Sequence, residues 1–252
     1  MSKKVPGKKI FAVIISYNAE KTIENVINEI PLDWVDDIVI SDDCSTDNTY
    51  DIIKKIPHIK GLRNKKNIHM GGNQKVIYDY ALSNGADIIV LLHGDNQYDA
   101  SMVPSMIEPI LNNTADAVLG SRILGGKALE GGMPLYKYFA NHLLNFIQNS
   151  VYQLKLSDYA TGYKAYSNKL LTSIPYHLNR DDFIFDEQLN TQMIYFKFRL
   201  SQVGIPTRYF KEASSVNFFT SVYYGLWTLL LMLQFALSKS KIYIPKFLSK
   251  AN

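Results

Sequence analysis

The chain has 252 residues, 47% hydrophobic and 20% charged, which is typical of a packed globular protein and excludes a largely disordered one. Its single cysteine, Cys44, excludes an intramolecular disulfide framework and favours a reducing compartment. Much of the net charge of +4 lies in lysine-rich stretches at 2–9 and 239–246, and no interleaving of basic and aromatic residues predicts nucleic-acid binding. No apolar segment precedes residue 10, so no signal peptide is expected.

The first third of the chain alternates between strand and helix patterns. Short apolar runs at 10–16, 37–41 and 87–92 predict strands buried on both faces, and a further short strand is expected at 59–63. Helices are predicted between these strands at 20–30, which stops before Pro31, at 47–56, with Asp47 as N-cap, and at 72–83, closed by Asn84-Gly85. These spacings predict right-handed parallel crossovers and hence a doubly wound α/β sheet.

The rest of the chain continues this pattern less regularly. It contains a predicted helix at 101–111, a strand at 115–120, a glycine-rich loop at 122–134, a helix at 134–152, strands at 159–166 and 204–210, and a helix at 183–198. No internal repeat or low-complexity linker interrupts it. We therefore expect one α/β domain over 8–217, with a central, mostly parallel sheet.

The C-terminal part, 218–252, has a different composition. Residues 222–237 are almost entirely apolar, but these 16 residues are fewer than the roughly 20 that span a bilayer. Lys239 and Lys241 follow the segment, and aromatic residues lie near its start. This pattern predicts an apolar, amphipathic helix that lies in a membrane interface, followed by a basic tail. The alternative is a core helix or an oligomer contact.

A polar loop follows the apolar strand at 87–92. It carries Asp95 and Gln97, whose carboxylate and amide oxygens are ligands that a hard divalent cation prefers. In open α/β sheets, ligands bind outside the carboxyl ends of the strands, which is where these side chains are expected. The loop therefore indicates a cation site, with an ordinary surface loop as the alternative.

Further polar side chains follow the other predicted strands at the same edge. Asp42 and Asp43 come after the second strand, where acids accept hydrogen bonds from the ribose or base of a nucleotide. Gly71 and Gly72 open the third helix, whose N-terminus suits an anionic phosphate. The loop after the first strand completes the predicted nucleotide site with Ser16, Tyr17 and Asn18. The absence of a Gly-x-Gly-x-x-Gly or a Gly-Lys-Ser/Thr loop argues against dinucleotide-binding and P-loop folds.

Four of these segments occur in an order that resembles glycosyltransferase family 2. They are residues 16–18, 39–49 (VISDDCSTDNT), the glycines at 71–72, and 91–98 (LLHGDNQY). The second is similar to the Val-Asp-Asp-Gly-Ser-Thr-Asp-Gly-Thr motif of the family, and the last to its metal-binding Asp-x-Asp motif. The resemblance covers roughly 8–220 and implies the GT-A fold, a nucleotide-diphosphate-sugar donor and a divalent cation, Mg²⁺ or Mn²⁺.

Four later segments resemble one subgroup, the polyprenyl-phosphate glycosyltransferases related to dolichol-phosphate mannose synthase. The segments are 120–126 (GSRILGG), 131–137 (GGMPLYK), 157–166 (SDYATGYKAY) and 181–186 (DDFIFD). This resemblance implies transfer, with inversion, from a nucleotide sugar to a lipid phosphate by a cytoplasmic protein bound peripherally to the cytoplasmic face of a membrane. Arg122 and Lys137 are expected to bind the acceptor phosphate or the donor diphosphate, with a solvated helix residue as the alternative for Lys137. Thr161 and Lys164 are expected to line the floor of the acceptor site.

The chain departs from the family at His93, which replaces the first acid of Asp-x-Asp. Imidazole suits Mg²⁺ poorly, so we expect His93 near the ribose or a phosphate of the donor, with Asp95 and Gln97 on the metal. A phosphate acceptor is already ionised and needs no strong base. A hydroxyl acceptor would need one, and the candidate catalytic acids besides Asp95 are Asp158, Asp186 and Glu187. For Asp181, Asp182 and Asp186, helix capping is the alternative.

Two other functions remain open from the sequence. One is a glycosyltransferase that acts on a saccharide hydroxyl in polysaccharide or glycan assembly. The other is a non-catalytic nucleotide-sugar-binding protein, which the altered motif at His93 keeps under consideration.

Overall fold

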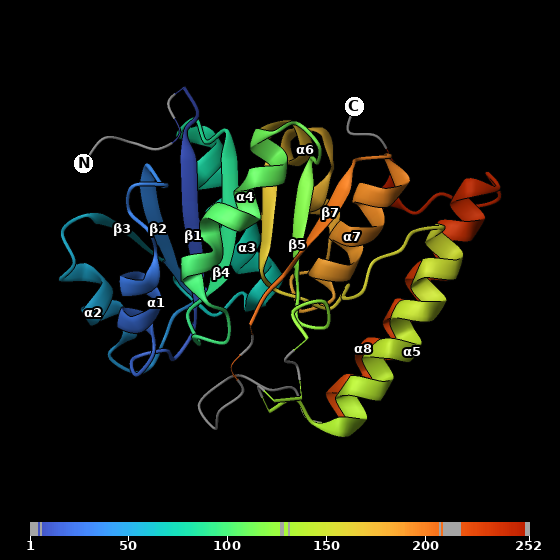
Figure 1. Ribbon diagram of the computed structural model, residues 1–252, viewed down its shortest axis with the longest axis horizontal. Helices are drawn as coiled ribbons and strands as arrows, with labels where there is room; N and C mark the ends of the chain where they lie inside the picture. The colour runs from blue at the N-terminus through green and yellow to red at the C-terminus, as the bar shows by residue number, and fades with distance from the viewer. Residues whose placement is uncertain are drawn as a thin grey trace.

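The computed structural model describes residues 5, 7–126, 129–130, 132–206, 208 and 218–249. Its seven-stranded sheet has the order β3-β2-β1-β4-β6-β5-β7 (Figure 1). The strands are β1 (Ile10–Ser16), β2 (Asp37–Asp42), β3 (Ile59–Arg63), β4 (Ile88–His93), β5 (Ala117–Ser121), β6 (Lys164–Ser167) and β7 (Leu200–Gly204). The α-helices are α1 (Ile23–Glu29), α2 (Thr49–Lys54), α3 (His69–Ser83), α4 (Val103–Leu111), α5 (Leu135–Tyr152), α6 (Asn168–Ser173), α7 (Phe185–Tyr195) and α8 (Phe218–Lys239). Short 3₁₀ turns are η1 (Ala100–Met102), η2 (Tyr176–Leu178) and η3 (Lys246–Leu248).

Strand direction places most of the carboxyl ends at one edge of the sheet. β1 pairs in parallel with β2 and with β4, β2 pairs in parallel with β3, and β5 pairs in parallel with β7. β6 alone is antiparallel, and it lies between β4 and β5. The predicted α/β architecture with a mostly parallel sheet is confirmed, and the antiparallel β6 is a feature that the sequence pattern did not predict.

Two apolar cores cover the two faces of the sheet. Alternate residues of β1 point to opposite faces, as the pleat of a strand requires. Ile10, Ala12 and Ile14 pack in one core with α1 and α4, and the other core joins the opposite face of β1 to α3 and α7. Because both faces of β1 are buried, its sequence reads as a continuous apolar run.

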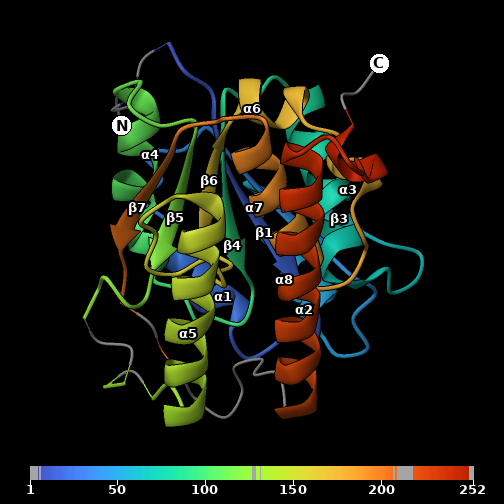
Figure 2. The ribbon, with the colours of Figure 1, turned by 90° about the vertical axis from the view of Figure 1, so that its right-hand side faces the viewer.

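The two longest helices, α5 and α8, contact each other outside these layers. They run side by side and extend beyond the edge of the sheet at which β1 ends (Figures 1 and 2). Tyr152 of α5 packs with Met232 and Phe235 of α8 in a third apolar cluster. Over Thr220–Lys239, α8 is long and apolar enough to cross a membrane, and it is longer than the 16-residue apolar run suggested.

Most predicted elements are confirmed to within a few residues, but two strands are not. The strand predicted at 159–166 is only β6, Lys164–Ser167, and the preceding residues form a loop. The strand predicted at 204–210 is displaced: β7 spans Leu200–Gly204, because its pairing with β5 begins at Leu200. The N-cap of α2 is Asn48, not Asp47 as predicted; Asp47 lies one residue earlier and accepts hydrogen bonds from the backbone N–H and hydroxyl of Thr49, the first residue of the helix. The predicted domain boundary at 217 and parts of the 122–134 loop lie outside the described residues.

Candidate active site

Two adjoining pockets lie at the edge of the sheet where the parallel strands end. The first has a volume of about 370 Å³ and the second of about 490 Å³. Met70, His93 and Asp95 line both pockets, so the pockets meet at the end of β4. The two cavities therefore share a wall at the carboxyl end of β4, which is where ligands bind in open α/β sheets.

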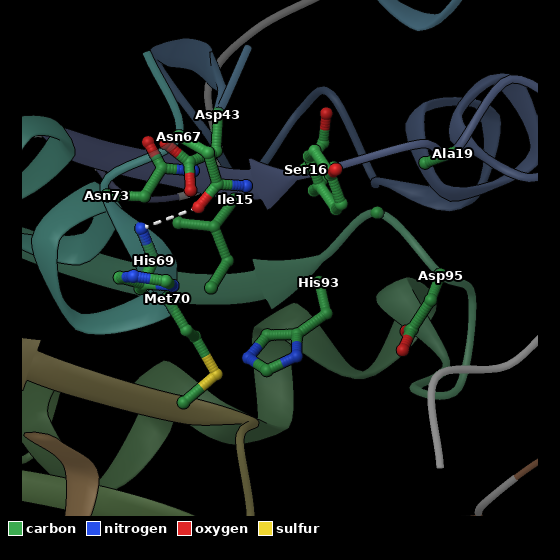
Figure 3. Close-up of a pocket in the computed structure, with 12 residues that line it drawn as sticks. Ile15, Ser16, Ala19, Asp43, Asn67, His69, Met70, Asn73, His93 and Asp95 are labelled. Carbon is green, nitrogen blue, oxygen red and sulfur yellow. Dashed lines mark hydrogen bonds between the residues drawn. The ribbon is translucent and has the colours of Figure 1, made fainter. Parts of the chain in front are cut away.

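The first pocket is lined by residues that follow β1 and β2 and by the start of α3. Ser16, Tyr17 and Asp43 are the members that the sequence predicted, and Asn67, His69 and Asn73 join them (Figure 3). The Oδ1 atom of Asp43 accepts hydrogen bonds from the Asn64 side chain and from the backbone N–H of Ile68, both at 2.9 Å. These bonds hold the carboxylate of Asp43 at the pocket wall, where it can accept from a bound nucleotide.

Four of the predicted nucleotide-binding residues do not line either pocket, namely Asp42, Asn18 and the glycines Gly71 and Gly72. Asp42 is fully buried, and its Oδ2 atom accepts from the backbone N–H of Ser45 at 3.2 Å and lies 3.4 Å from Arg63 Nε. The Asn18 side chain accepts from the backbone N–H of Thr46 at 2.9 Å. Both residues hold the loops after β1 and β2 together, so the structure gives them a supporting position behind the pocket.

The glycine pair at the start of α3 serves helix packing. A Cβ atom on Gly71 would lie 2.5 Å from Phe185 Cβ and 2.7 and 2.8 Å from the carbonyl oxygens of Arg180 and Asp182. The backbone N–H of Gly72 donates to the carbonyl oxygen of Asp181 at 3.0 Å. The expectation that these glycines approach a donor phosphate is therefore corrected: Gly71 lets α3 pack closely on the segment that leads into α7, the backbone N–H of Gly72 is bonded to that segment, and neither glycine lines a pocket.

The loop after β4 directs Asp95 and Gln97 to the second pocket. Asn96 between them adopts a left-handed backbone conformation with φ of 57°. The backbone N–H of Gln97 donates to Asp95 Oδ1 at 3.2 Å, and this bond closes the turn. The sequence prediction that these two side chains lie together is consistent with this geometry.

His93 forms the wall between the pockets. Its ring packs edge-on against Tyr98 with centroids 5.6 Å apart, and the Tyr98 hydroxyl accepts from the backbone N–H of Gly162 at 2.8 Å. A Cβ atom on Gly162 would lie 2.5 Å from His93 Cε1 and 2.6 Å from Nε2, so only glycine leaves room for the ring. His93 Nε2 is buried with no hydrogen-bond partner in the described part of the chain.

A buried ion pair lies at the wall of the second pocket. Arg122, which lines the pocket, donates from Nε and Nη2 to the two oxygens of Asp158 at 2.7 and 2.8 Å, and its backbone N–H donates at 3.1 Å. Asp158 is fully buried and does not line the pocket. The expectation that Asp158 is a candidate general base is therefore corrected: its carboxylate orients the guanidinium of Arg122.

A second cation, Lys137 at the start of α5, faces the same pocket as Arg122. Burial lowers the pKa of Lys137, and the nearby charge of Arg122 lowers it further. Two like charges at one wall disfavour each other unless an anion lies between them. Thr161, buried on the same wall, adds a hydroxyl group. All three residues line the second pocket, and the arrangement suits an anionic ligand.

Comparison with known proteins identifies the chain. Residues 11–174 match the model of the family described as glycosyl transferase family 2. The chain belongs to this family. It is 32% identical over 180 residues to a UDP-N-acetylglucosamine–dolichyl-phosphate N-acetylglucosaminyltransferase of Methanococcus voltae, covering 65% of this chain and 71% of the relative. It is 25% identical over 173 residues to an undecaprenyl-phosphate mannosyltransferase of Micrococcus luteus, covering 66% and 69%.

The solved structures to which this glycosyltransferase is similar have the GT-A fold. A glucosyl-3-phosphoglycerate synthase from Mycobacterium tuberculosis, crystallised with Mn²⁺, UDP and phosphoglyceric acid, superposes with a TM-score of 0.69. The sequence identity is 19%, and the match covers 95% of this chain and 80% of the other. The GT-A fold predicted from the four motifs is confirmed.

In this glycosyltransferase, only one of the acids around the start of α7 lines the second pocket. Asp186 does so, and its Oδ1 atom accepts from Lys164 Nζ at 3.0 Å. Lys164 is fully buried and also donates to Asn190 at 3.2 Å, so the expected contact of Lys164 with the acceptor is corrected. Glu187 is 1% exposed and lines neither pocket, which corrects its prediction as a catalytic acid. Burial raises the pKa of Glu187.

The donor set fits a cation that the substrate helps to hold. Asp95 and Gln97 supply one carboxylate and one amide, and the described residues contain no group of three or more His, Cys, Asp or Glu side chains placed to hold a metal. Mg²⁺ in nucleotide enzymes is commonly bound by one or two carboxylates together with substrate phosphates. These side chains therefore suit a cation that arrives with a diphosphate.

Several lining residues were missed by the sequence analysis. His69 and Asn73 of α3 line the first pocket, and Tyr136, Phe183 and Tyr224 line the second. Tyr136 and Phe183 lie in the segments 131–137 and 181–186, and His69 and Asn73 lie beside the glycine pair at 71–72, so membership of these motifs was the available signal. Tyr224 lies on the apolar helix α8, where nothing in the local sequence distinguishes it from a packing residue.

Proposed function

We propose that this protein transfers a glycosyl group, with inversion, from a nucleotide-diphosphate sugar to a polyprenyl phosphate at a membrane surface. One observation carries the proposal. A pocket lined by two cations, Arg122 and Lys137, adjoins the nucleotide pocket at His93 and opens between α5 and α8, whose outer faces are apolar. The relatives named above act on dolichyl phosphate and undecaprenyl phosphate, which supports this acceptor class.

The donor is proposed to occupy the first pocket, with its diphosphate at the shared wall. Asp95 and Gln97 would hold a divalent cation, Mg²⁺ or Mn²⁺, which when bound neutralises the charge of the leaving diphosphate. The Mn²⁺ and UDP in the similar glucosyl-3-phosphoglycerate synthase support this assignment. Asp43 accepts a hydrogen bond from the nucleoside, and His93 separates the donor from the acceptor pocket.

The acceptor phosphate is proposed to bind at Arg122 and Lys137. One of its oxygens attacks the anomeric carbon from the side opposite the diphosphate, a new carbon–oxygen bond forms, and the nucleoside diphosphate leaves with the bonding electron pair. A phosphate is ionised at neutral pH, so no side chain has to remove a proton. This agrees with Asp186, the one predicted base at the pocket, being paired with Lys164.

Membrane attachment is proposed through the outer faces of α5 and α8. Exposed apolar side chains recur every three or four residues along each helix, so they form one stripe per helix. The stripes consist of Leu135, Tyr136, Phe139, Leu143 and Phe146 on α5, and Val222, Tyr223, Leu226, Leu229, Leu230 and Leu233 on α8. An apolar surface of this kind is typical of a membrane contact and places the pocket near the acceptor, here assigned to the cytoplasmic face.

The proposal is tested in two steps. Thermal shifts are measured with a panel of nucleotide sugars, with and without Mg²⁺ or Mn²⁺, for the wild type and Asp95→Ala. We expect a metal-dependent shift with one donor that Asp95→Ala abolishes. The labelled donor is then incubated with a polyprenyl phosphate, and the product is extracted into organic solvent.

Each alternative function has its own outcome in this experiment. A labelled product that stays in water and forms only with saccharides or soluble phosphorylated compounds contradicts the lipid acceptor. Donor binding without transfer to any acceptor favours a non-catalytic nucleotide-sugar-binding protein. Wild-type protein that gives no thermal shift with any donor contradicts the glycosyl-transfer assignment itself.

A further inference from the structure

Three helices meet at one buried carboxylate that touches neither pocket. Glu187, in the first turn of α7, is 1% exposed. Its Oε2 atom accepts from Gln148 Nε2 of α5 at 2.9 Å, and its Oε1 atom accepts from the hydroxyl of Tyr224 of α8. Both oxygens of one buried acid are therefore used to join two helices that residues 153–217 separate in the sequence.

This junction lies at the edge of the second pocket. Tyr224 itself lines the pocket. On α5 the pocket is lined by Lys137, Ala140, Asn141 and Leu144, of which Leu144 lies one turn before Gln148. Asp186, the residue before Glu187, faces the pocket from α7. In the first turn of α7, Asp186 thus forms part of the pocket wall, and Glu187 next to it bonds α5 and α8, which form other parts of the same wall.

Other contacts also hold α8 to the protein, among them a hydrogen bond of 3.4 Å from Arg180 Nη2 to the Tyr223 hydroxyl. Met232 and Phe235 pack with Tyr152 farther along α8, and Arg180 lies over the Trp227 ring at 4.5 Å. These contacts keep α8 attached to the protein. Near the pocket, the Tyr224 ring also packs against Phe183, a contact without the directionality of a hydrogen bond to a charged group. Loss of the hydroxyl would therefore loosen α8 at the pocket without detaching the helix.

We propose that Glu187 is a positioning residue for the acceptor: by holding Gln148 and Tyr224, it sets the separation of α5 and α8 at the second pocket. The inference rests on the proposed function, because the pocket is taken to bind a prenyl phosphate. Glu187 acts through Tyr224 and contacts neither substrate. Its effect is on acceptor affinity, while the first pocket, formed by other elements, binds the donor unchanged.

The test compares two tyrosine-to-phenylalanine substitutions. Tyr224→Phe removes only the hydroxyl that bonds Glu187, and Tyr152→Phe removes a buried hydroxyl that joins α5 to Thr191 of α7 at 3.0 Å without lining a pocket. The KM for a short-chain prenyl phosphate, the KM for the donor and the melting temperature are measured for each. We expect Tyr224→Phe to raise the acceptor KM about tenfold, the equivalent of one hydrogen bond to a charged group, with the donor KM unchanged.

The possible results separate the inference from the proposed function. Equal acceptor KM values for the two variants, or a parallel rise in donor and acceptor KM, overturn the positioning role alone. Wild-type protein that neither binds nor glycosylates the prenyl phosphate overturns both. If Tyr224→Phe does not fold, Glu187→Gln, which keeps the size of the side chain, is measured in the same way and is expected to raise the acceptor KM selectively.

Discussion

Replacing Asp158 with asparagine distinguishes an orienting role from a catalytic one. Asp158 is fully buried, Arg122 is 8% exposed, and three hydrogen bonds of 2.7, 2.8 and 3.1 Å join them. The substitution leaves a buried guanidinium beside a neutral amide that can accept only part of these bonds. Because breaking a buried ion pair from one side costs about 3–5 kcal/mol, we expect Asp158→Asn to lose about 3 kcal/mol of unfolding free energy.

Urea unfolding measures this loss, with Asp95→Asn as the control. Asp95 lies in a partly exposed turn, so its substitution should abolish metal-dependent donor binding with a much smaller change in the urea midpoint. The double substitution Arg122→Met/Asp158→Leu should recover most of the stability, because it removes both buried charges, but not the activity. An Asp158→Asn protein with the wild-type urea midpoint and no transfer activity would refute the orienting role and indicate a base.

Three further predictions follow from the packing, the burial and the exposed surface. Gly71→Ala should lose about 2 kcal/mol or more in urea unfolding, since its Cβ meets backbone oxygens at 2.7 and 2.8 Å. Gly72→Ala should be milder, since its Cβ would meet no backbone atom as closely and would lie 3.2 Å or more from the Ile68 side chain; equal midpoints would contradict the packing role of Gly71. Burial raises the pKa of Glu187 above 4.5, so the folded state holds the proton more tightly, and the unfolding free energy should fall as pH rises from 4.5 through the folded-state pKa. Glu187→Gln should remove this part of the pH dependence. An unchanged pH profile in the variant would contradict this role of Glu187. Leu143→Glu on α5 should weaken flotation with anionic liposomes about tenfold. The control is Leu32→Glu, which changes an exposed leucine before β2 and should leave flotation unchanged. Equal flotation of the two variants would argue against the α5 stripe as a membrane contact.

The elements that were predicted well are those whose burial can be inferred from the periodic pattern of apolar residues within the segment. β1 and β4 are covered on both faces, so their sequences are uninterrupted apolar runs, and the helices between them show apolar residues at helical spacing. β7 was misplaced because it pairs only with β5 in the described structure and is half-buried, with Ser201 and Gln202 in its centre. β6 was predicted too long because residues 159–163 are apolar and aromatic, yet they turn past Tyr98 and His93.

The predicted site residues divide in a similar way. Asp43, Asp95, Gln97, Arg122 and Thr161 line the pockets, because each follows the end of a strand or lies next to one that reaches this edge. Asp158, Lys164 and Glu187 belong to the same motifs but are buried behind the wall. A motif shows that an acid lies near the site, but whether the side chain faces the pocket depends on partners that are distant in sequence, such as Arg122 for Asp158.

The sequence by itself determined the α/β class, the order of the strands and helices along the chain, the family, and the edge at which polar residues gather. These follow from local periodicity and from motifs at the ends of strands. Only the tertiary structure decided that β6 is antiparallel, that Gly71 and Gly72 serve helix packing, and that Glu187 joins α5 to α8. The reason is physical: burial, ion pairing and close approach are properties of pairs of segments, and no pattern within one segment specifies its partner.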